Sequence, residues 1–278
     1  MIPQSPAAVP ALLYGTAWKE QRTEELVLLA LDAGFRGIDT ANQRKHYFEA
    51  AVGAALGRAL GEGRVTREEL FLQTKFTFAR GQDHRLPYDP SADYATQVEQ
   101  SFASSLEHLG TDYLDSYVLH GPYGGGALQK QDWDVWRAME RIAERGQVRF
   151  LGASNVDLAE LRALVKDAGV RPAFVQNRCY ARTGWDRGVR AFCTEHGIVY
   201  QGFSLLTANA RELERREVRA IAERAGATVP AVVFRFALAL GMLPLTGTSN
   251  PAHMRADLAS PALALTPDEI RLLETISG

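Results

Sequence analysis

The feature that most constrains the fold is the alternation of strand-like and helix-like segments along the chain. Short apolar runs, many with β-branched or aromatic residues, alternate with longer segments whose apolar residues recur at helical spacing. Eight strand-like runs occur, at residues 12–16, 35–40, 70–76, 113–120, 148–154, 174–178, 198–204 and 243–247. Repeated strand–helix units predict parallel strands joined by right-handed crossovers.

The segments between these runs predict helices at residues 23–33, 49–60, 91–109, 133–144, 158–167, 214–225 and 229–240, with a closing helix from Pro267. Eight strand–helix units in 278 residues predict a closed (β/α)8 TIM barrel, an α/β fold that forms a single domain over residues 1–278. A doubly wound dinucleotide fold would carry GxGxxG between its first strand and helix. The compact glycine run at residues 124–126 has no helix directly after it, so it does not match.

Composition narrows the class of protein. Apolar residues make up 46% of the chain and charged residues 23%, which is typical of a globular protein with a large core. The formal charge of −2 argues against nucleic acid or an anionic membrane as a partner. The two cysteines, Cys179 and Cys193, show no metal-ligand spacing, so no metal site is expected. Residues 1–6 lack the pattern of a secretory signal, and no apolar run approaches the roughly 20 residues that span a bilayer, so we expect a cytoplasmic protein. No pattern predicts an oligomeric state.

Ionisable residues lie at successive ends of the predicted strands. Active sites of such barrels are built on the loops at the C-terminal ends of the strands. Asp39 ends the second strand, Lys75 lies near the end of the third, and His120 ends the fourth. The loop after Asp39 also carries His46 and Tyr47. These residues on one rim predict a proton-transfer site.

The motifs, taken in order, resemble those of the aldo-keto reductase family over nearly the full length. The matching segments are residues 35–41, 70–76, 112–122, 152–155 and 247–249. The resemblance implies a barrel that binds NADPH without a Rossmann domain. It also implies an oxidoreductase that reduces the carbonyl of a small-molecule aldehyde or ketone to an alcohol.

The resemblance also implies catalytic roles. Asp39 matches the acid that pairs with a lysine, Lys75 matches that lysine, and His120 matches the histidine that orients the substrate carbonyl. The family's proton donor is a tyrosine five residues after the acid, where this chain has Arg44.

The loop after Asp39 therefore leaves two candidates for the proton donor. Counting back from the helix that starts at Glu49 places His46 at the family's tyrosine, with Tyr47 one step further on. Phenol has a pKa of about 10, and a neighbouring Lys⁺ stabilises phenolate and disfavours imidazolium. We therefore expect Tyr47 to be the acid and Lys75 to lower its pKa, with His46 as the alternative.

A second set of residues matches the family's cofactor site. Ser154, Asn155 and Gln176 match residues that bind the nicotinamide carboxamide. Phe203 matches the aromatic residue that stacks on the nicotinamide ring, and Ser204 and Leu205 begin the loop over the pyrophosphate.

The end of the site that would hold the adenosine departs from the common pattern. Many members clamp the ribose 2′-phosphate with Lys-Ser and a later Arg, but the aligned residues here are Gly247, Thr248 and His253. Arg255 and the backbone N–H groups around Ser249 are the remaining phosphate contacts that the sequence offers. We expect NADPH, with NADH as the alternative.

Two other functions fit parts of the pattern. A cofactor-binding barrel with low turnover, acting in redox sensing or regulation, is compatible with the displaced tyrosine. A barrel aldolase or isomerase would use a lysine Schiff base, but the Asp39 and tyrosine setting of Lys75 suits reduction better. Substrate size is expected to depend on Trp18 and on loops at residues 82–88, 122–131 and 207–211.

Overall fold

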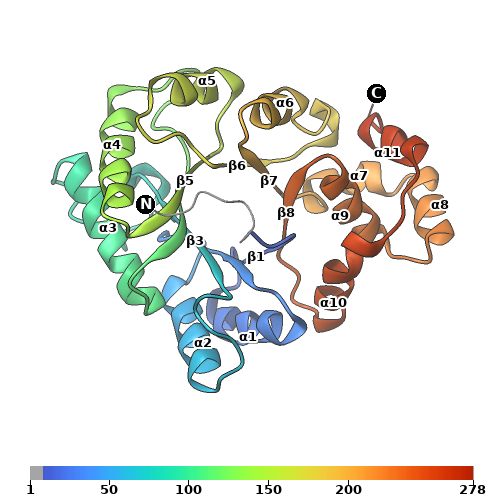
Figure 1. Ribbon diagram of the computed structural model, residues 1–278, viewed down its shortest axis with the longest axis horizontal. Coiled ribbons are helices and arrows are strands. Elements are labelled where there is room, and N and C mark those ends of the chain that lie inside the picture. The colour runs from blue at the N-terminus through green and yellow to red at the C-terminus, as the bar shows by residue number, and fades with distance from the viewer. Residues whose placement is uncertain (1–8, 278) are drawn as a thin grey trace.

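Eight parallel strands close into a barrel, which confirms the predicted (β/α)8 fold (Figure 1). The computed structural model describes residues 9–277, so the N-terminal residues weighed as a possible leader lie outside it. The strands are β1 (Leu13–Gly15), β2 (Gly37–Asp39), β3 (Phe71–Phe76), β4 (Leu114–Leu119), β5 (Val148–Ser154), β6 (Phe174–Arg178), β7 (Val199–Phe203) and β8 (Met242–Thr246). Each strand pairs with the next along the chain, and β8 pairs with β1 to close the barrel.

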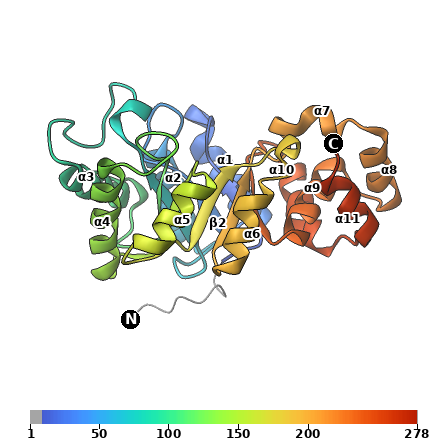
Figure 2. The same ribbon diagram turned by 90° about the horizontal axis from the view of Figure 1, so that it is seen from above.

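Helices cover the outside of the barrel. They are α1 (Thr23–Ala33), α2 (Glu49–Gly61), α3 (Tyr94–Leu109), α4 (Lys130–Glu144), α5 (Leu158–Asp167), α6 (Arg187–Glu195), α7 (Ala210–Leu213), α8 (Arg216–Arg224), α9 (Val229–Ala239), α10 (Pro251–Ala259) and α11 (Pro267–Glu274). Seen from above, α3 and α4 lie at one end of the molecule and α8, α9 and α11 gather at the other (Figure 2). Among residues 9–277, no helix combines the length and apolarity needed to span a bilayer.

Two helices begin at other residues than predicted, because capping side chains fix where they start. Helix α3 begins at Tyr94 and not at residue 91, because the side chain of Asp93 accepts a hydrogen bond from the N–H of Thr96. Helix α4 begins three residues earlier than predicted, because Gln129 opens a capping box with Asp132. Helix α6 was not predicted, since it is short and begins with Arg-Gly.

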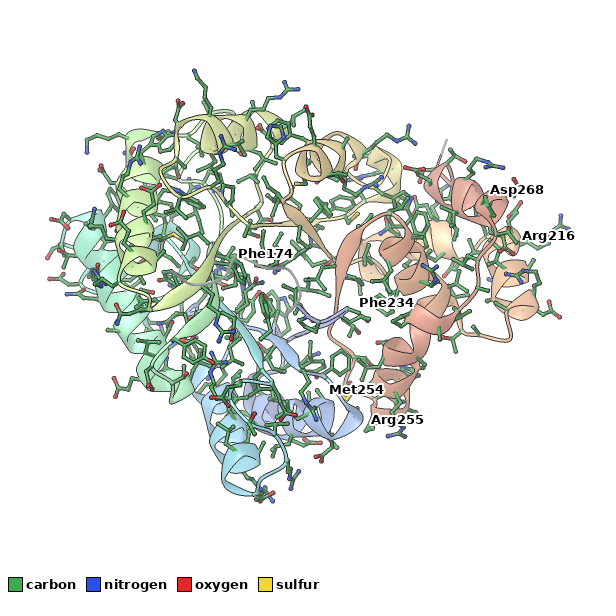
Figure 3. The ribbon with its side chains drawn as sticks, viewed as in Figure 1. Phe174, Arg216, Phe234, Met254, Arg255 and Asp268 are labelled. Atoms are coloured by element: carbon green, nitrogen blue, oxygen red, sulfur yellow. The ribbon has the colours of Figure 1, made fainter. Side chains whose placement is uncertain are left out.

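The barrel interior is apolar near the N-terminal ends of the strands and polar toward their C-terminal ends. Near the N-terminal ends of their strands, the rings of Phe71 and Phe150 each meet that of Phe174 edge to face, at centroid distances of 5.5 and 5.6 Å. Phe174 lies at the centre of the barrel (Figure 3). Gln73 follows Phe71 by two residues on β3, so its side chain points to the same face. Gln201 lies on β7, and both glutamines are fully buried inside the barrel. The apolar layer therefore supports a polar layer that lies under the C-terminal rim.

The contact between α2 and α3 offers a test of this packing. A Cβ atom added to Gly53 would lie 1.8 Å from the carbonyl oxygen of His108, whereas one added to Gly57 on the same helix meets nothing within 4 Å. We expect Gly53→Ala to lower the free energy of unfolding by about 1–3 kcal/mol, because the two helices must separate. Gly57→Ala is the control and should raise it by up to about 1 kcal/mol. Denaturant titration measures both, and equal effects of the two substitutions would refute the close contact between α2 and α3 at Gly53.

Candidate active site

A buried ion pair occupies the centre of the site. The ammonium of Lys75 donates to both carboxylate oxygens of Asp39, at 2.6 and 2.8 Å, and to the carbonyl oxygen of Thr40 at 2.8 Å. Lys75 is fully buried, and Asp39 is 2% exposed. Burial lowers the pKa of Lys75, and the Asp39 carboxylate opposes that shift. All three hydrogens of the ammonium are thus used within the protein.

Tyr47 and His120 stand beside this pair. The Lys75 ammonium lies 5.3 Å from the centroid of the Tyr47 ring, and that ring meets His120 edge to face at 5.9 Å. Burial, followed by the charge of Asp39, raises the pKa of Tyr47. The prediction of a lowered pKa is wrong, because burial and the charge of Asp39 set the direction of the shift. Tyr47 therefore holds its proton throughout the physiological pH range.

His120 is a neutral imidazole in this setting. Burial and the charge of Lys75 lower the pKa of His120 to about 3. Its Nδ1 atom shares a hydrogen bond of 2.7 Å with the hydroxyl of Thr77, which leaves Nε2 for a ligand. Such a group can hold a carbonyl oxygen, but it carries no positive charge above about pH 4.

His46 lies at the edge of the same pocket, with its ring centroid 4.1 Å from that of Trp18. The amide nitrogen of Gln43 donates to the carbonyl oxygen of Gly81 at 2.6 Å, so Oε1 of Gln43 faces His46 Nδ1 at 3.0 Å. Because an amide oxygen only accepts, the proton of neutral His46 is on Nδ1. Burial and the charge of Lys45 lower the pKa of His46. Its Nε2 atom therefore presents a lone pair and no proton.

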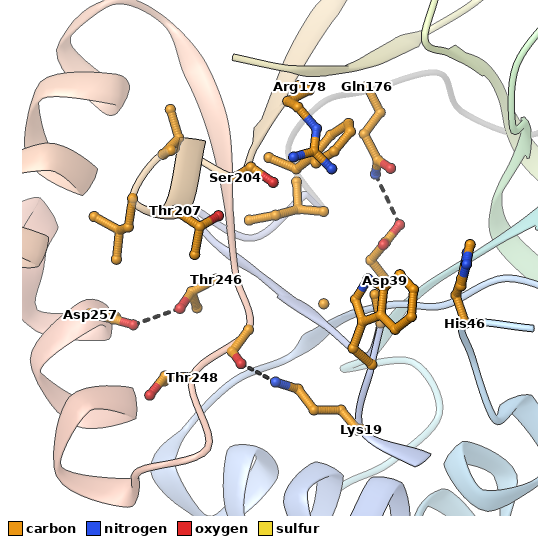
Figure 4. A pocket seen from close by; sticks show the side chains of 18 of the residues that line it. Lys19, Asp39, His46, Gln176, Arg178, Ser204, Thr207, Thr246, Thr248 and Asp257 are labelled. Carbon is orange, nitrogen blue, oxygen red and sulfur yellow. Dashed lines mark hydrogen bonds between the residues drawn. The ribbon is translucent and has the colours of Figure 1, made fainter. Parts of the chain in front are cut away.

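Strands β5 and β6 supply the amide-bearing side of the pocket. The hydroxyl of Ser154 donates to the carbonyl oxygen of Gln176 at 2.6 Å, and the amide nitrogen of Asn155 donates to the carbonyl oxygen of His120 at 2.7 Å. The amide nitrogen of Gln176 donates to Asp39 at 3.0 Å (Figure 4). Asn155 has a φ of 54°, a left-handed conformation that non-glycine residues rarely adopt and that concentrates at functional sites.

Strand β7 ends at the aromatic wall of the pocket. The guanidinium of Arg178 lies 5.3 Å from the centroid of the Phe203 ring, a cation–π distance. Ser204, which follows, has a φ of 56°, so the chain turns sharply from β7 into the loop. Arg178 and Ser204 line the pocket beside one another (Figure 4), and Phe203 also lines it.

The opposite wall is held by β1, β8 and α10. The ammonium of Lys19 donates to the carbonyl oxygen of Gly247, and the hydroxyl of Tyr14 donates to that of Thr248 at 3.0 Å. The hydroxyl of Thr246 donates to the carboxyl of Asp257 at 2.8 Å, and burial raises the pKa of Asp257 to about 6. Thr248 and Asp257 lie at the far end of the pocket from His46 (Figure 4). Lys19 and the N-terminus of α10 contribute positive charge to this wall, and Asp257 contributes negative charge when it is ionised.

Most of the predicted site residues line one pocket of about 710 Å³, a volume within the range of ligand sites. Those that line it are Asp39, Tyr47, His120, Ser154, Asn155, Gln176, Phe203, Ser204, Leu205, Gly247, Thr248 and His253, together with His46 and Trp18. Lys75 does not line the pocket and pairs with Asp39, which does. Ser249 and Arg255 do not line the pocket. Arg255 is two residues past His253, about 200° around α10, and points outward (Figure 3).

Three charged residues of the pocket were missed, namely Lys19, Arg178 and Asp257. The rule that located Asp39 and His120 would have found Lys19 and Arg178, since Arg178 ends β6 and Lys19 follows β1 closely. Asp257 carried no such signal, because it lies in the second turn of a helix.

Comparison with known proteins decides the family. The model of the aldo/keto reductase family matches residues 12–277. The chain belongs to the aldo/keto reductase family. It is 32% identical to an aldo-keto reductase of Mycolicibacterium vanbaalenii, over 92% of this chain and 83% of that protein. It is 29% identical to 2,5-diketo-D-gluconic acid reductase B of a Corynebacterium species, over 91% and 82% of the two chains. The crystal structure of a Bombyx mori aldo-keto reductase in complex with NADP superposes with a TM-score of 0.81, at 22% identity, over 96% and 89% of the two chains.

Membership makes this aldo/keto reductase an NADP-dependent oxidoreductase that reduces the carbonyl group of a small-molecule aldehyde or ketone. The residues of the pocket fit that cofactor. Amide groups of Asn155 and Gln176 match a carboxamide, and Phe203 offers an aromatic face. Lys19 and the first turn of α10 offer positive charge for phosphate.

Proposed function

We propose that Tyr47 protonates the substrate oxygen in this reductase and that His120 positions that oxygen. The charges of Asp39 and Lys75 set the electrostatic field around the phenol. NADPH, when bound, supplies the hydride. Nε2 of neutral His120 then carries the hydrogen that binds the carbonyl oxygen, provided that Thr77 donates to Nδ1. The Tyr47 phenol carries its proton before the reaction, and the nearby ammonium of Lys75 stabilises the negative charge that develops as the proton leaves.

One observation carries the choice of Tyr47 over His46. The amide of Gln43 fixes the proton of His46 on Nδ1, away from any acceptor at Nε2, and the lowered pKa of His46 keeps the ring neutral. Tyr47 has a proton to give, contacts the ring of His120 and lies next to Lys75. The same features favour a working reductase over a low-turnover sensor, since all four groups of the proposed reaction are present on one side of the pocket.

Paired substitutions test the proton donor. We expect Tyr47→Phe to lower kcat for aldehyde reduction by about 10²- to 10⁴-fold, the range for loss of a general acid. His46→Gln, which keeps a polar side chain beside Gln43, should leave kcat close to that of the unsubstituted enzyme. Steady-state NADPH oxidation and a fluorescence titration of NADPH binding separate chemistry from binding. A fully active Tyr47→Phe variant would refute the assignment, and binding without turnover in the unsubstituted enzyme would favour the regulatory alternative.

We further propose that the substrate carries a negative charge. A second pocket of about 240 Å³ shares Trp18, His46 and Tyr47 with the main one and is also lined by Arg44, Lys45, Arg85, Gln21 and Glu20. Asp83 pairs with Arg85, but among residues 9–277 no carboxylate forms an ion pair with Arg44 or Lys45. The charge of Lys45 already influences His46. The positively charged side chains that line this second pocket thus outnumber its one carboxylate, that of Glu20. In addition, one relative is named as a reductase of an acid, 2,5-diketo-D-gluconic acid.

A matched pair of aldehydes tests the charge preference. We expect kcat/KM for succinic semialdehyde to exceed that for butanal, which has the same chain length and no carboxylate. Lys45→Gln should reduce this advantage about fivefold, equivalent to about 1 kcal/mol for an exposed charge, and added salt should reduce it as well. Arg58→Gln on the exposed face of α2 is the control and should leave it unchanged. Equal kcat/KM values for the two aldehydes would refute the preference and leave the reductase assignment intact.

A further inference from the structure

Three glutamine side chains lie together inside the barrel, directly under the ion pair. Gln73 on β3 and Gln201 on β7 are fully buried, and Gln176 on β6 is 4% exposed. Only Gln176 lines the pocket, so the catalytic groups described above leave Gln73 and Gln201 without a role. Buried polar side chains are costly unless their hydrogen bonds are made, which directs attention to their partners.

The three amides form a closed hydrogen-bonded network with Asp39. The amide nitrogen of Gln73 donates to Oδ1 of Asp39 at 2.7 Å and to Oε1 of Gln201 at 2.8 Å. The amide nitrogen of Gln201 returns a bond to Oε1 of Gln73 at 2.9 Å. The amide nitrogen of Gln176 donates to Oδ1 of Asp39 at 3.0 Å and to Oε1 of Gln201 at 2.9 Å. Gln201 therefore accepts from both of the other glutamines.

The carboxylate of Asp39 dictates how each amide is oriented. A carboxylate only accepts, so Gln73 and Gln176 must turn their nitrogen atoms toward it. Gln201 must then turn its oxygen toward both nitrogens, and its own nitrogen reaches Oε1 of Gln73. Reversing any one amide would place two acceptors, or two donors, against each other. The network consequently has one arrangement.

This arrangement limits what Gln176 can offer to a ligand. An amide nitrogen has two hydrogens, and both hydrogens of Gln176 are used, one by Asp39 and one by Gln201. Its Oε1 atom alone remains for the pocket. Gln176 can thus bind a hydrogen-bond donor, such as a primary carboxamide, but it cannot donate to a carbonyl.

We propose that Gln73 and Gln201 are positioning residues that present Oε1 of Gln176 to the NH₂ group of the nicotinamide carboxamide and hold Asp39 on Lys75. The inference rests on the assignment of the pocket to NADPH and adds to it how the carboxamide is recognised. It concerns residues that do not touch the cofactor, so their effect must pass through Gln176 and Asp39.

A cofactor analogue makes the inference measurable. In 3-acetylpyridine adenine dinucleotide phosphate a methyl ketone replaces the carboxamide, so the donor for Gln176 is missing. In the unsubstituted protein, fluorescence titration of the oxidised cofactors should give a Kd at least about tenfold higher for the analogue than for NADP⁺, equivalent to about 1.4 kcal/mol. In Gln201→Leu, Gln176 loses its acceptor and can turn, so the two Kd values should converge.

Ser116→Ala is the matched control. Ser116 pairs with Gln73 in the barrel and is fully buried, but its hydroxyl makes no hydrogen bond within residues 9–277. This substitution alters the same layer without touching the network, so the discrimination between NADP⁺ and the analogue should persist. Loss of discrimination in Ser116→Ala as well would show a general packing effect and overturn the inference.

Gln201→Glu distinguishes the proposed positioning role from a purely structural one, because only the positioning role predicts a pH-dependent affinity. A protonated carboxyl can accept from Gln176 and donate to Gln73, as the amide does, and burial raises the pKa of a glutamic acid. We expect this variant to bind NADP⁺ like the unsubstituted protein at low pH. As the pH rises and the carboxyl ionises, the donor to Gln73 is lost and a negative charge faces Asp39. The affinity for NADP⁺ should then fall at least about tenfold relative to that of the unsubstituted protein at the same pH.

The outcomes separate the two claims. If the unsubstituted protein binds neither NADPH nor NADP⁺, the assignment of the pocket fails. If it binds NADP⁺ and reduces aldehydes, but Gln201→Leu discriminates against the analogue as before or Gln201→Glu follows the same pH profile as the unsubstituted protein, the pocket assignment stands and the role of Gln73 and Gln201 is refuted.

Discussion

The buried pair of Asp39 and Lys75 is the interaction on which the site depends. Two charges out of water cost several kcal/mol each unless their hydrogen-bonding capacity is met. Here it is met from four strands of the barrel, since β2 supplies Asp39, β3 supplies Lys75 and Gln73, β6 supplies Gln176, and β7 supplies Gln201, whose amide orients those of the other glutamines. The pair and its partners therefore link β2, β3, β6 and β7 by hydrogen bonds directly under the proposed site.

Burial, reinforced by the field of this pair, explains the protonation states of the neighbouring Tyr47 and His120. The charge of Lys75 contributes to the low pKa of His120, and that of Asp39 contributes to the raised pKa of Tyr47. A neutral imidazole and a protonated phenol thus face the same space. This is the combination that a carbonyl needs, one group to hold the oxygen and one to protonate it.

The architecture, and the grouping of the proposed catalytic residues at one rim, could be predicted from the sequence because both follow from position along strands. Asp39 and His120 stand where the strands end, and the barrel brings strand ends together. The depth of a side chain, and the partner that uses its hydrogens, depend on contacts between distant strands. For that reason the sequence did not reveal that burial and Asp39 raise the pKa of Tyr47, or that the three donors of Lys75 are taken by Asp39 and Thr40. Gln73 and Gln201 looked like ordinary strand residues, and their pairing across the barrel became visible only in three dimensions.

The most direct test replaces the charges without leaving one of them unpaired. In the double variant Asp39→Asn/Lys75→Met, no buried charge is orphaned, so the barrel should remain folded and NADPH should still bind. Single-turnover oxidation of NADPH by an aldehyde should nevertheless slow by about a hundredfold or more, because nothing then stabilises the phenolate as Tyr47 releases its proton. Hydride transfer at the rate of the unsubstituted enzyme would contradict the account, since the ion pair would then serve the fold alone.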